Sequence, residues 1–499
     1  MLVALLMALE TVQQYAFNAD AVSGLYITNF DQGKRWFVNE ETYIVKAVFN
    51  TVITRYFGIS SLSVSLAQII NISLFIALVG LLLWNYSIQM NLNKLKRYTL
   101  LAWSAFFLLN PYFYTSFFMI PHIRSFELLL VFFFIWYLKT NTASWYGNLL
   151  SVVAFALLSA SDMYLFIVFV LPAVIFITWE RRSEPKFIRD LLIKSVFFTL
   201  TIVFYQKILE KIEWQPVHHL INTVSYSDFL SRLVAFPNEI LEKSGIVVFN
   251  QPVFSIEFLV STLSVAIIGL VIVFAFVNRR LLLQDHWMPL LIRLSVASIL
   301  IIALADRSGG HYFVGPTILL ASLGMVVISY CNDRQIKVVL LFTSCIVLFR
   351  ILWFAFSISN CSFGNQHLFS CSPTKSALLG SIDLKQLDLE NVSGKILTDY
   401  WTAWELNAYY GRQLATPVGC SKNRLKPFLG NARAEQFEGT FTHVLIDTNA
   451  IDFKLCSLDE IFVNYRLGNA TSITPSISLF TLEQPLVVNS DLTNFFFLQ

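Results

Sequence analysis

Long apolar runs alternate with short polar segments over the first 357 residues of the chain. A helix needs roughly 17–25 mostly apolar residues to cross the hydrocarbon core of a bilayer. Runs near this length lie at 61–86, 99–119, 124–139, 147–160, 164–179, 193–208, 257–277, 287–305, 313–331 and 338–357. A weaker run at 2–17, which contains Glu10, is interpreted as the second half of a first span. The pattern predicts a polytopic α-helical membrane domain over residues 1–357, with about 11 transmembrane helices.

The pattern changes after residue 357, where polar residues reach the density of a soluble domain. Residues 358–499 carry 10 basic and 13 acidic side chains. Apolar runs at Lys395–Thr398 and His443–Ile446 have the length of strands, and Ala403–Tyr410 has the pattern of a helix. These 142 residues suffice for one core. The sequence therefore predicts a small exported α/β domain at the C-terminus.

The composition supports membrane embedding and excludes several classes of protein. Of the 499 residues, 56% are hydrophobic and 13% are charged, whereas soluble domains are roughly 45–50% apolar and about 25% charged. This excludes a soluble enzyme, a disordered chain and a fibrous repeat. The formal net charge of +3 provides no large basic surface for a phosphate backbone, so we expect no nucleic-acid partner.

Lysine and arginine are distributed unevenly between the two sets of loops. The loops assigned to the cytoplasm hold 13 of them in 50 residues, and the opposite loops hold 9 in 109 residues. Basic residues concentrate in cytoplasmic loops, so we expect the N-terminus inside and the long loops 18–60 and 209–257 outside. The sequence looks like that of a bacterial protein. We therefore expect a multi-pass protein of the cytoplasmic (inner) membrane with a periplasmic or extracellular C-terminal domain.

Two further features concern the outer segments. Asn39 is a candidate cap for an amphipathic helix over 39–57, which would either lie on the membrane or pack on the bundle as a loop helix. Four cysteines fall in the exported domain, and an even number in an oxidising compartment predicts two disulfides with three alternative pairings. These candidates are Cys361, Cys371, Cys420 and Cys456.

Ionisable residues cluster where the predicted helices reach the outer face. They are Asp20, His122, Arg124, Asp162, Asp306, Arg307 and His311. Each has an ordinary structural reading: a solvated loop residue, a headgroup contact, a helix cap or a local ion pair. Together, on one side of a compact bundle, they indicate a site, because such groups are costly at membrane level. Arg350, inside the last span, would either neutralise a headgroup or pair with a carboxylate.

Short motifs in a fixed order carry a resemblance. They are Pro121-His122, Ser161-Asp162-Met163-Tyr164-Leu165, His311-Tyr312 with Pro316, and Asp399-Tyr400-Trp401-Thr402-Ala403-Trp404. With Asp20 after the first span, the layout resembles polytopic glycosyltransferases of the GT-C fold, such as protein mannosyltransferases and the aminoarabinose transferase of lipid A. It is closest to a poorly characterised bacterial group with this architecture. The Asp-Glu pair common in the mannosyltransferases is Asp20-Ala21 here, which leaves one carboxylate.

The resemblance implies transfer of a sugar from a polyprenyl-phosphate donor to a glycan, lipid or protein acceptor at the outer membrane face, with inversion. Asp20 is the predicted general base. Arg124, Arg307, His311 and His122 are the predicted contacts of the donor phosphate, with Asp162 and Asp306 in supporting roles. Asp399, Tyr400 and Trp401 are predicted to contact the acceptor sugar, or alternatively to pack the small domain. No cofactor or metal site is predicted, although a divalent metal is left open.

Two other functions fit the same pattern. A transporter or flippase would also carry ionisable groups in a polytopic bundle, but repeats and mid-membrane charges are typical of transporters. Here the groups lie at helix ends. A non-catalytic assembly factor on the same architecture is the other alternative, and the single carboxylate at Asp20 is consistent with it.

Overall fold

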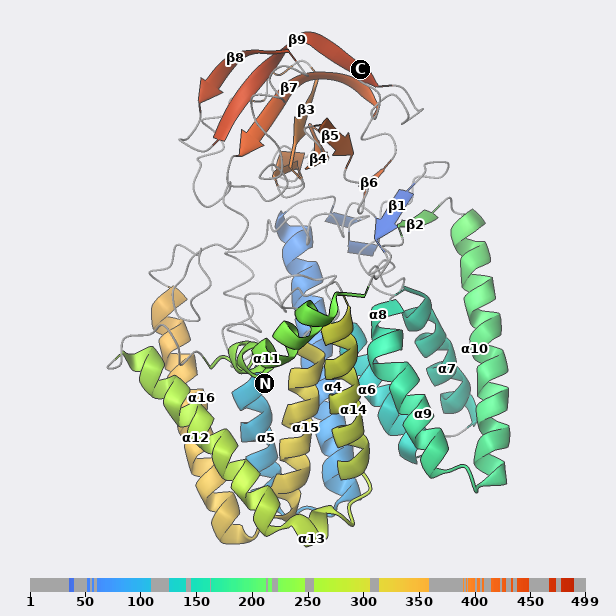
Figure 1. Cartoon of the computed structure of the whole chain (residues 1–499), viewed down its shortest axis with the longest axis vertical. Helices are drawn as coiled ribbons and strands as arrows, with labels where there is room; N and C mark the ends of the chain where they lie inside the picture. Colours follow the sequence, from blue (N-terminus) through green and yellow to red (C-terminus); the bar gives the residue numbers. More distant parts are fainter. Residues whose placement is uncertain are drawn as a thin grey trace.

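The computed structural model of the chain describes its helical and sheet regions with gaps. The described residues are 36–39, 52–53, 56–57, 61–108, 125–140, 145–161, 163–211, 214–217, 223–246, 255–305, 314–358, 389, 392, 394–399, 402–403, 406–407, 414–421, 424–427, 432–433, 438–447, 466–472 and 477–488. Within them the protein is mostly helical, with a smaller region of strands above one end of the helices (Figure 1).

Helices occur at each of the apolar runs from 61 onward. They are α4 (Ser61–Gln89), α5 (Lys94–Leu108), α6 (Ser125–Thr140), α7 (Trp145–Ser161), α8 (Met163–Leu165), the π-helix η2 (Phe166–Val170), α9 (Leu171–Glu180), α10 (Pro185–Lys211), α11 (Tyr226–Lys243), α12 (Ile256–Val277), α13 (Arg279–Leu282), α14 (Met288–Leu304), α15 (Val314–Tyr330) and α16 (Asp333–Ile358). Most of these helices run side by side in a bundle, and the end nearer the strands is called the sheet-proximal end (Figure 1).

Some helices begin before the predicted runs, and two of them, α5 and α10, show a local reason. α5 begins at Lys94 rather than at 99, because the Asn93 side chain accepts a hydrogen bond from Lys96 N at 2.9 Å and caps the helix. α10 begins at Pro185 rather than at 193, since proline is favoured in the first helical turn. Both extensions add charged turns that an apolar pattern does not reveal.

Two helices in the described part of the chain are long and apolar enough to cross a membrane. They are Phe258–Val277 in α12 and Asp333–Leu352 in α16, each of 20 residues. Shorter apolar helices of 10–17 residues accompany them, at Ser73–Gln89, Leu128–Thr140, Ser151–Ala160, Phe166–Glu180, Met288–Leu304 and Val314–Tyr330.

Close contacts between helices rest on paired large and small residues. Trp103 of α5 is buried, and its indole N–H donates to the Ala321 carbonyl of α15 at 2.9 Å. Its ring lies against Gly324, where an added Cβ would fall 2.4 Å from the ring. A glycine at this position therefore lets α5 and α15 approach closely.

The sheet-distal end is held by a shared carboxylate. Glu180, the last residue of α9, accepts hydrogen bonds from Lys139 of α6 and from Arg293 of α14, the latter at 3.2 Å. One carboxylate thus joins three helices. In the same region Asp285 Oδ1 accepts from Met288 N at 2.8 Å and caps α14, while its Oδ2 accepts from Tyr330 at 2.8 Å.

The C-terminal region contains a six-stranded mixed sheet of order β5-β4-β3-β7-β9-β8. The strands are β3 (Lys395–Thr398), β4 (Ala415–Ser421), β5 (Arg424–Pro427), β7 (Gly439–Asp447), β8 (Leu467–Ser472) and β9 (Ile477–Val488). β3 pairs parallel with β4 and β7, and the outer pairs are antiparallel. The strands predicted at Lys395–Thr398 and His443–Ile446 are therefore confirmed as β3 and as part of β7. Residues 402–403 and 406–407 are helical.

A second, three-stranded sheet joins distant parts of the chain in the order β2-β1-β6. β1 (Trp36–Asn39) comes from loop 18–60, β2 (Trp214–Val217) from loop 209–257, and β6 (Ala432–Arg433) from the C-terminal domain. Trp36 pairs with Trp214 on one side and with Arg433 on the other. This sheet lies between the bundle and the six-stranded sheet (Figure 1).

Candidate functional site

The helix boundaries around the predicted site residues fall at the sheet-proximal end of the bundle. α6 begins one residue after Arg124, and α7 and α8 flank Asp162. α14 ends shortly before Asp306, and α15 begins three residues after His311. All these boundaries lie at the end that faces the strands (Figure 1). Asp20, His122, Arg124, Asp162, Asp306, Arg307 and His311 themselves lie outside the described residues.

The helices that follow Asp162 and His311 touch near their starts. The Phe169 ring of η2 lies against Gly315, in the first turn of α15, where an added Cβ would fall 2.1 Å from Phe169 Cζ. Phe169 is 1% exposed, and Tyr164 and Phe132 flank it with ring centroids 6.4 and 6.0 Å away. The Tyr164 and Leu165 side chains of the 161–165 motif are thus buried packing residues.

After the short helix α8 that follows Asp162, the chain forms a π-helix instead of continuing as an α-helix. η2 runs from Phe166 to Val170 and passes directly into α9, which carries Pro172 in its first turn. π-helical turns occur frequently at functional sites, because the extra residue redirects the side chains that precede it. This irregularity lies four residues from Asp162 and was not evident from the apolar pattern.

α11 is bonded to the segment that leads into loop 306–313. Val224 N donates to the Leu304 carbonyl at 3.0 Å, and Thr223 forms an antiparallel bridge with Ala305. Arg232 also donates to the Ala305 carbonyl. Ala305 immediately precedes Asp306, so α11 fixes the backbone from which the candidate loop starts.

Arg350 fills neither role expected from the sequence. It is 2% exposed, which excludes a contact with a headgroup in this arrangement, and no carboxylate bonds it among the described residues. Its guanidinium instead donates to the carbonyl of Phe106, in the last described turn of α5, at 2.5 Å. It also donates to the Ser244 and Gly245 carbonyls just after α11, at 3.4 and 3.2 Å.

The physical reason is that helix C-termini leave carbonyls without intrahelical partners and carry partial negative charge. Arg350 therefore places a cation against the carbonyls that follow the C-terminus of α11, and it also bonds the Phe106 carbonyl of α5. Its guanidinium also lies 4.8 Å from the Phe106 ring centroid, and it donates to Ser264 Oγ of α12 at 3.4 Å. Its Nε is buried and has no hydrogen-bond partner among the described residues.

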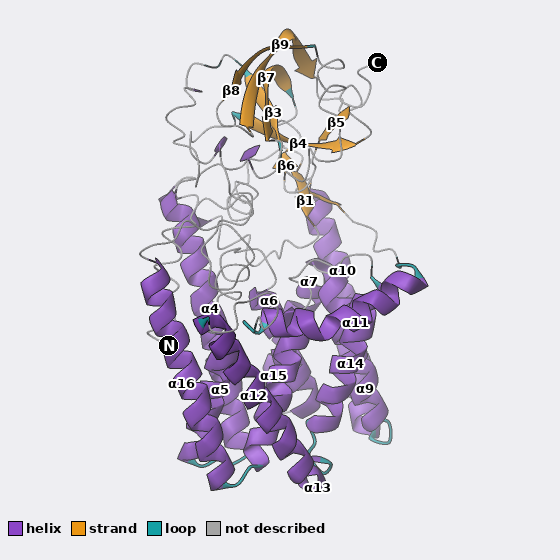
Figure 2. Ribbon diagram, turned by 60° about the vertical axis from the view of Figure 1, so that its left-hand side comes forward, coloured by secondary structure: helices purple, strands orange, loops and turns teal. Residues whose placement is uncertain are grey.

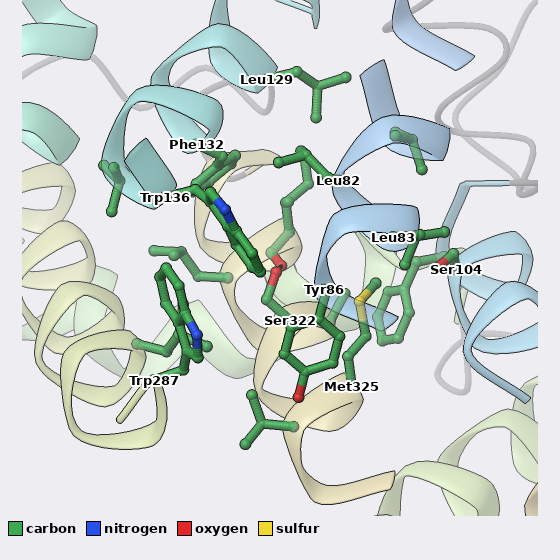
Figure 3. A pocket seen from close by; sticks show the side chains of 18 of the residues that line it. Leu82, Leu83, Tyr86, Ser104, Leu129, Phe132, Trp136, Trp287, Ser322 and Met325 are labelled. Atoms are coloured by element: carbon green, nitrogen blue, oxygen red, sulfur yellow. Dashed lines mark hydrogen bonds between the residues drawn. The ribbon is translucent and has the colours of Figure 1, made fainter. Parts of the chain in front are cut away.

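An apolar cavity of about 140 Å³ lies inside the bundle among α4, α5, α6, α14 and α15. Trp136 and Trp287 stack on one wall with centroids 4.5 Å apart, and the Tyr86 ring meets Trp136 edge-on with centroids 6.0 Å apart (Figure 3). Few polar atoms line it; Ser104 and Ser322 contribute two of its side-chain hydroxyls. The Tyr86 hydroxyl donates to Ser329 Oγ at 3.0 Å. Such a cavity suits an apolar chain rather than a charged ligand.

Asp399 is the described member of the predicted acceptor contacts. It follows β3, the strand between β4 and β7, and its Oδ1 accepts from Thr402 N at 3.1 Å. It therefore caps the helical residues that follow, and it is 1% exposed. With Asp399 buried in this way, the predicted acceptor contact would fall to Tyr400 and Trp401, which lie outside the described residues.

The predicted disulfides are also not covered by the described side chains. Cys361, Cys371 and Cys456 lie outside the described residues, and Cys420 is described only as part of β4. Among described cysteines, Cys331 and Cys345 are free thiols. Asn39 is the last residue of β1, and the helical residues 52–53 and 56–57 are the described part of the predicted helix 39–57.

Sequence reasoning missed α11 as an element and the partners of Arg350. A signal for α11 was present in Phe229, Leu233, Phe236 and Ile240, which recur at helical spacing after Ser225. No sequence signal indicates that Arg350 bonds to main-chain carbonyls, since carbonyls belong to every residue. Comparisons of the chain with protein-family models, with curated proteins and with solved structures find no match.

Proposed function

We propose that the chain is a polytopic membrane glycosyltransferase that moves a sugar from a polyprenyl-phosphate donor to an acceptor at the outer face of the cytoplasmic membrane. The observation that carries the proposal is the convergence of helix ends. The helices flanking Arg124, Asp162, Asp306 and His311 reach one end of the bundle, and Phe169 and Gly315 bring two of them into contact. The sheet-proximal end of the bundle is then at the outer face of the membrane. The bundle itself has about 11 spans.

The β2-β1-β6 sheet supports the same placement. It pairs segments of the two long outer loops with the C-terminal domain, and it lies between the bundle and the six-stranded sheet. An exported domain bonded to both loops is positioned to cover a membrane-level site and to present an acceptor. Water exclusion of this kind strengthens the interactions of charged groups with a reacting phosphate.

The proposed reaction exchanges one carbon–oxygen bond for another and moves one proton. The acceptor hydroxyl oxygen attacks the anomeric carbon, its proton passes to the Asp20 carboxylate, and the bond from the anomeric carbon to the phosphate oxygen breaks. The electron pair leaves with the lipid phosphate. Arg124, Arg307 and His311, aided by His122, stabilise the resulting negative charge. Attack opposite the phosphate inverts the anomeric centre.

The remaining residues support this site. Asp162 and Asp306 orient the cations or bind sugar hydroxyls, and Tyr400 and Trp401 stack on acceptor sugars. The apolar cavity among α4, α6 and α15 supports binding of part of an isoprenoid chain, because its walls are almost entirely hydrocarbon and indole.

The test is a mass-spectrometric comparison of lipid-linked sugars and glycans in three strains. These carry the wild-type chain, a deletion, or Asp20→Asn expressed at a matched level. The proposal expects one sugar to vanish from the glycans in both altered strains while its lipid-linked donor accumulates. A deletion that changes the profile while Asp20→Asn does not would remove Asp20 as the base and favour an assembly factor or transporter. An unchanged profile in the deletion would contradict the transferase itself.

A further inference from the structure

α11 lies across the bundle instead of along it. Figure 2 shows it crossing the upper parts of α14 and α15 instead of running alongside them. One face packs inward through partly buried Phe229, Leu233 and Phe236 and buried Ile240. The adjoining face, about a quarter-turn around the helix, carries Tyr226, Leu230 and Val234, which are 76, 43 and 81% exposed. The exposed apolar side chains recur every four residues and form one stripe.

Both ends of α11 are fixed. At the start, the Ser225 hydroxyl accepts from Asp228 N at 3.2 Å and caps the helix, while Val224 bonds to the end of α14. At the end, Gly245 adopts a φ of 75°, and Ile246 N donates to the Leu241 carbonyl at 2.9 Å. This closing turn places Ile246 in the core and presents carbonyls to Arg350. α11 is therefore held rigidly with its apolar stripe outward.

The stripe adjoins an exposed apolar surface on the bundle. α14, which α11 crosses, exposes Ile292, Val296, Leu300 and Leu304 at four-residue intervals along its length. Leu304 is also the residue whose carbonyl bonds Val224 at the start of α11. In a polytopic protein, such an exposed row of aliphatic side chains faces hydrocarbon. The exposed face of α11 thus continues the lipid-facing surface at its sheet-proximal limit.

We propose that α11 is an interfacial helix lying in the plane of the outer leaflet, with Tyr226, Leu230 and Val234 inserted among the lipids. Small polar residues border the stripe, including Ser227, Asp228, Ser231 and Asn238, all exposed. An apolar face of this kind, flanked by polar groups at bilayer depth, is the pattern of a helix at the headgroup boundary. Through Leu304 and Ala305 the same helix sets the membrane depth at which loop 306–313 begins.

This inference rests on the membrane embedding in the proposed function and is independent of the transfer reaction. The experiment places the photoreactive residue p-benzoylphenylalanine at one position at a time in the full-length chain. The positions are 230 and 234 in the stripe, 227 and 231 on the polar border, and 272 on α12. Ile272 is 52% exposed within a span long enough to cross a membrane. Each variant is reconstituted in phosphatidylcholine vesicles that contain an alkyne-tagged phosphatidylcholine, irradiated and assayed for tagged lipid on the protein.

The expected result is lipid adducts at 230, 234 and 272, several-fold above those at 227 and 231. All four α11 positions are exposed, so the substitutions leave the core intact. Adducts at 272 but not at 230 or 234, or equal adducts at all four α11 positions, would overturn the interfacial placement of α11. Adducts from 230 or 234 to other parts of this chain would also overturn it, since a protein segment then covers the stripe. Absence of adducts at 272 as well would overturn the membrane embedding itself, whatever the glycan profile shows.

Discussion

The ring of Phe169 lies against the backbone of Gly315, so that an added Cβ at position 315 would fall 2.1 Å from Phe169 Cζ. Phe169 follows Asp162 by seven residues, and Gly315 follows His311 by four. The contact joins two helices whose starts are separated by about 150 residues of chain. It links the helices that follow two of the candidate loops, and it depends on the absence of a side chain at one position.

Gly315→Ala should therefore destabilise the protein. The ring of Phe169 is buried and surrounded by Tyr164 and Phe132, so it has no space to move away from a new methyl group. Overpacking of this kind costs about 1–3 kcal/mol. The measurement is the free energy of unfolding of the purified full chain in detergent.

Gly80→Ala is the matched control, because an added Cβ there meets no atom within 4 Å. Alanine is the better helix former by about 1 kcal/mol, so this variant should be unchanged or more stable. Equal stability of the Gly315 and Gly80 variants would show that Phe169 does not press on α15.

Arg350→Lys should loosen the end of α11 even though the charge is kept. A lysine presents one compact ammonium and cannot reach the Phe106 and Gly245 carbonyls with a planar fork. A hydrogen bond to a charged group contributes about 1.5–3 kcal/mol. Hydrogen exchange at the amides of Gly245 and Ile246 should accelerate by at least about tenfold.

Arg334→Lys provides the comparison, since Arg334 is exposed near the start of α16. It should leave exchange at Gly245 and Ile246 unchanged. If Arg350→Lys also leaves these amides as protected as in the parent, the guanidinium is not what holds α11 in place.

Glu180→Gln should weaken the sheet-distal end of the bundle. The neutral amide leaves Lys139 and Arg293 without their shared carboxylate, and Lys139 is largely buried, with a side-chain exposure of 13%. The loss is on the order of 1–2 kcal/mol, between the values for exposed and buried pairs. Thermal unfolding of the full chain measures it.

Glu184→Gln is the counterpart at an exposed position. Glu184 pairs with Arg181 in the turn between α9 and α10, and solvent screening leaves such an exposed pair with little effect on stability. A larger loss for the Glu184 variant than for the Glu180 variant would refute the assignment of Glu180 as the residue joining three helices.

Acidification should destabilise the C-terminal domain through His443. Burial in β7 lowers the pKa of His443 from its ordinary value of 6.5. As the pH falls below 6.5, the unfolded chain therefore takes up a proton before the folded domain does. The stability is complete above the ordinary pKa and is lost as the pH falls through the lower folded value.

The measurement is thermal unfolding of the full chain at a series of pH values from neutral to mildly acidic, with and without His443→Gln. Glutamine keeps a hydrogen-bonding group beside Thr442 Oγ1, which lies 2.8 Å from His443 Nδ1. The parent should lose more stability on acidification than the variant. Parallel pH curves for the two proteins would rule out His443 as the titrating group.

Much of the helical region could be predicted because apolar runs report burial directly. The run at 257–277 matches α12 within one residue, and the strand at Lys395–Thr398 matches β3 in full. Where charged turns extend a helix, as at Lys94 in α5 and Pro185 in α10, the apolar pattern stops too early. A capping side chain sets the first residue of α5, and a proline sets the first residue of α10. The hydropathy pattern reveals neither feature.

Long-range pairing was beyond prediction from one sequence. Trp36, Trp214 and Arg433 stand on three adjacent strands, yet each strand spans four residues or fewer. Strands this short carry too little pattern to specify a partner. The main-chain partners of Arg350 could not be predicted for a related reason. Every residue has a backbone carbonyl, so the sequence does not indicate which carbonyls accept from Arg350.

The proposed site requires loops distant in sequence to meet at the sheet-proximal end of the bundle. This requirement is tested most directly by Asp162→Cys combined with His311→Cys in the full chain, treated with a short bis-maleimide and analysed by peptide mass spectrometry. Asp162→Cys with Asn332→Cys is the control, because exposed Asn332 lies beyond the far end of α15, about 25 Å away at 1.5 Å per residue. If the loops meet, we expect a linked peptide joining 162 to 311 and none joining 162 to 332. Efficient labelling of both single sites with no 162–311 link would contradict this expectation.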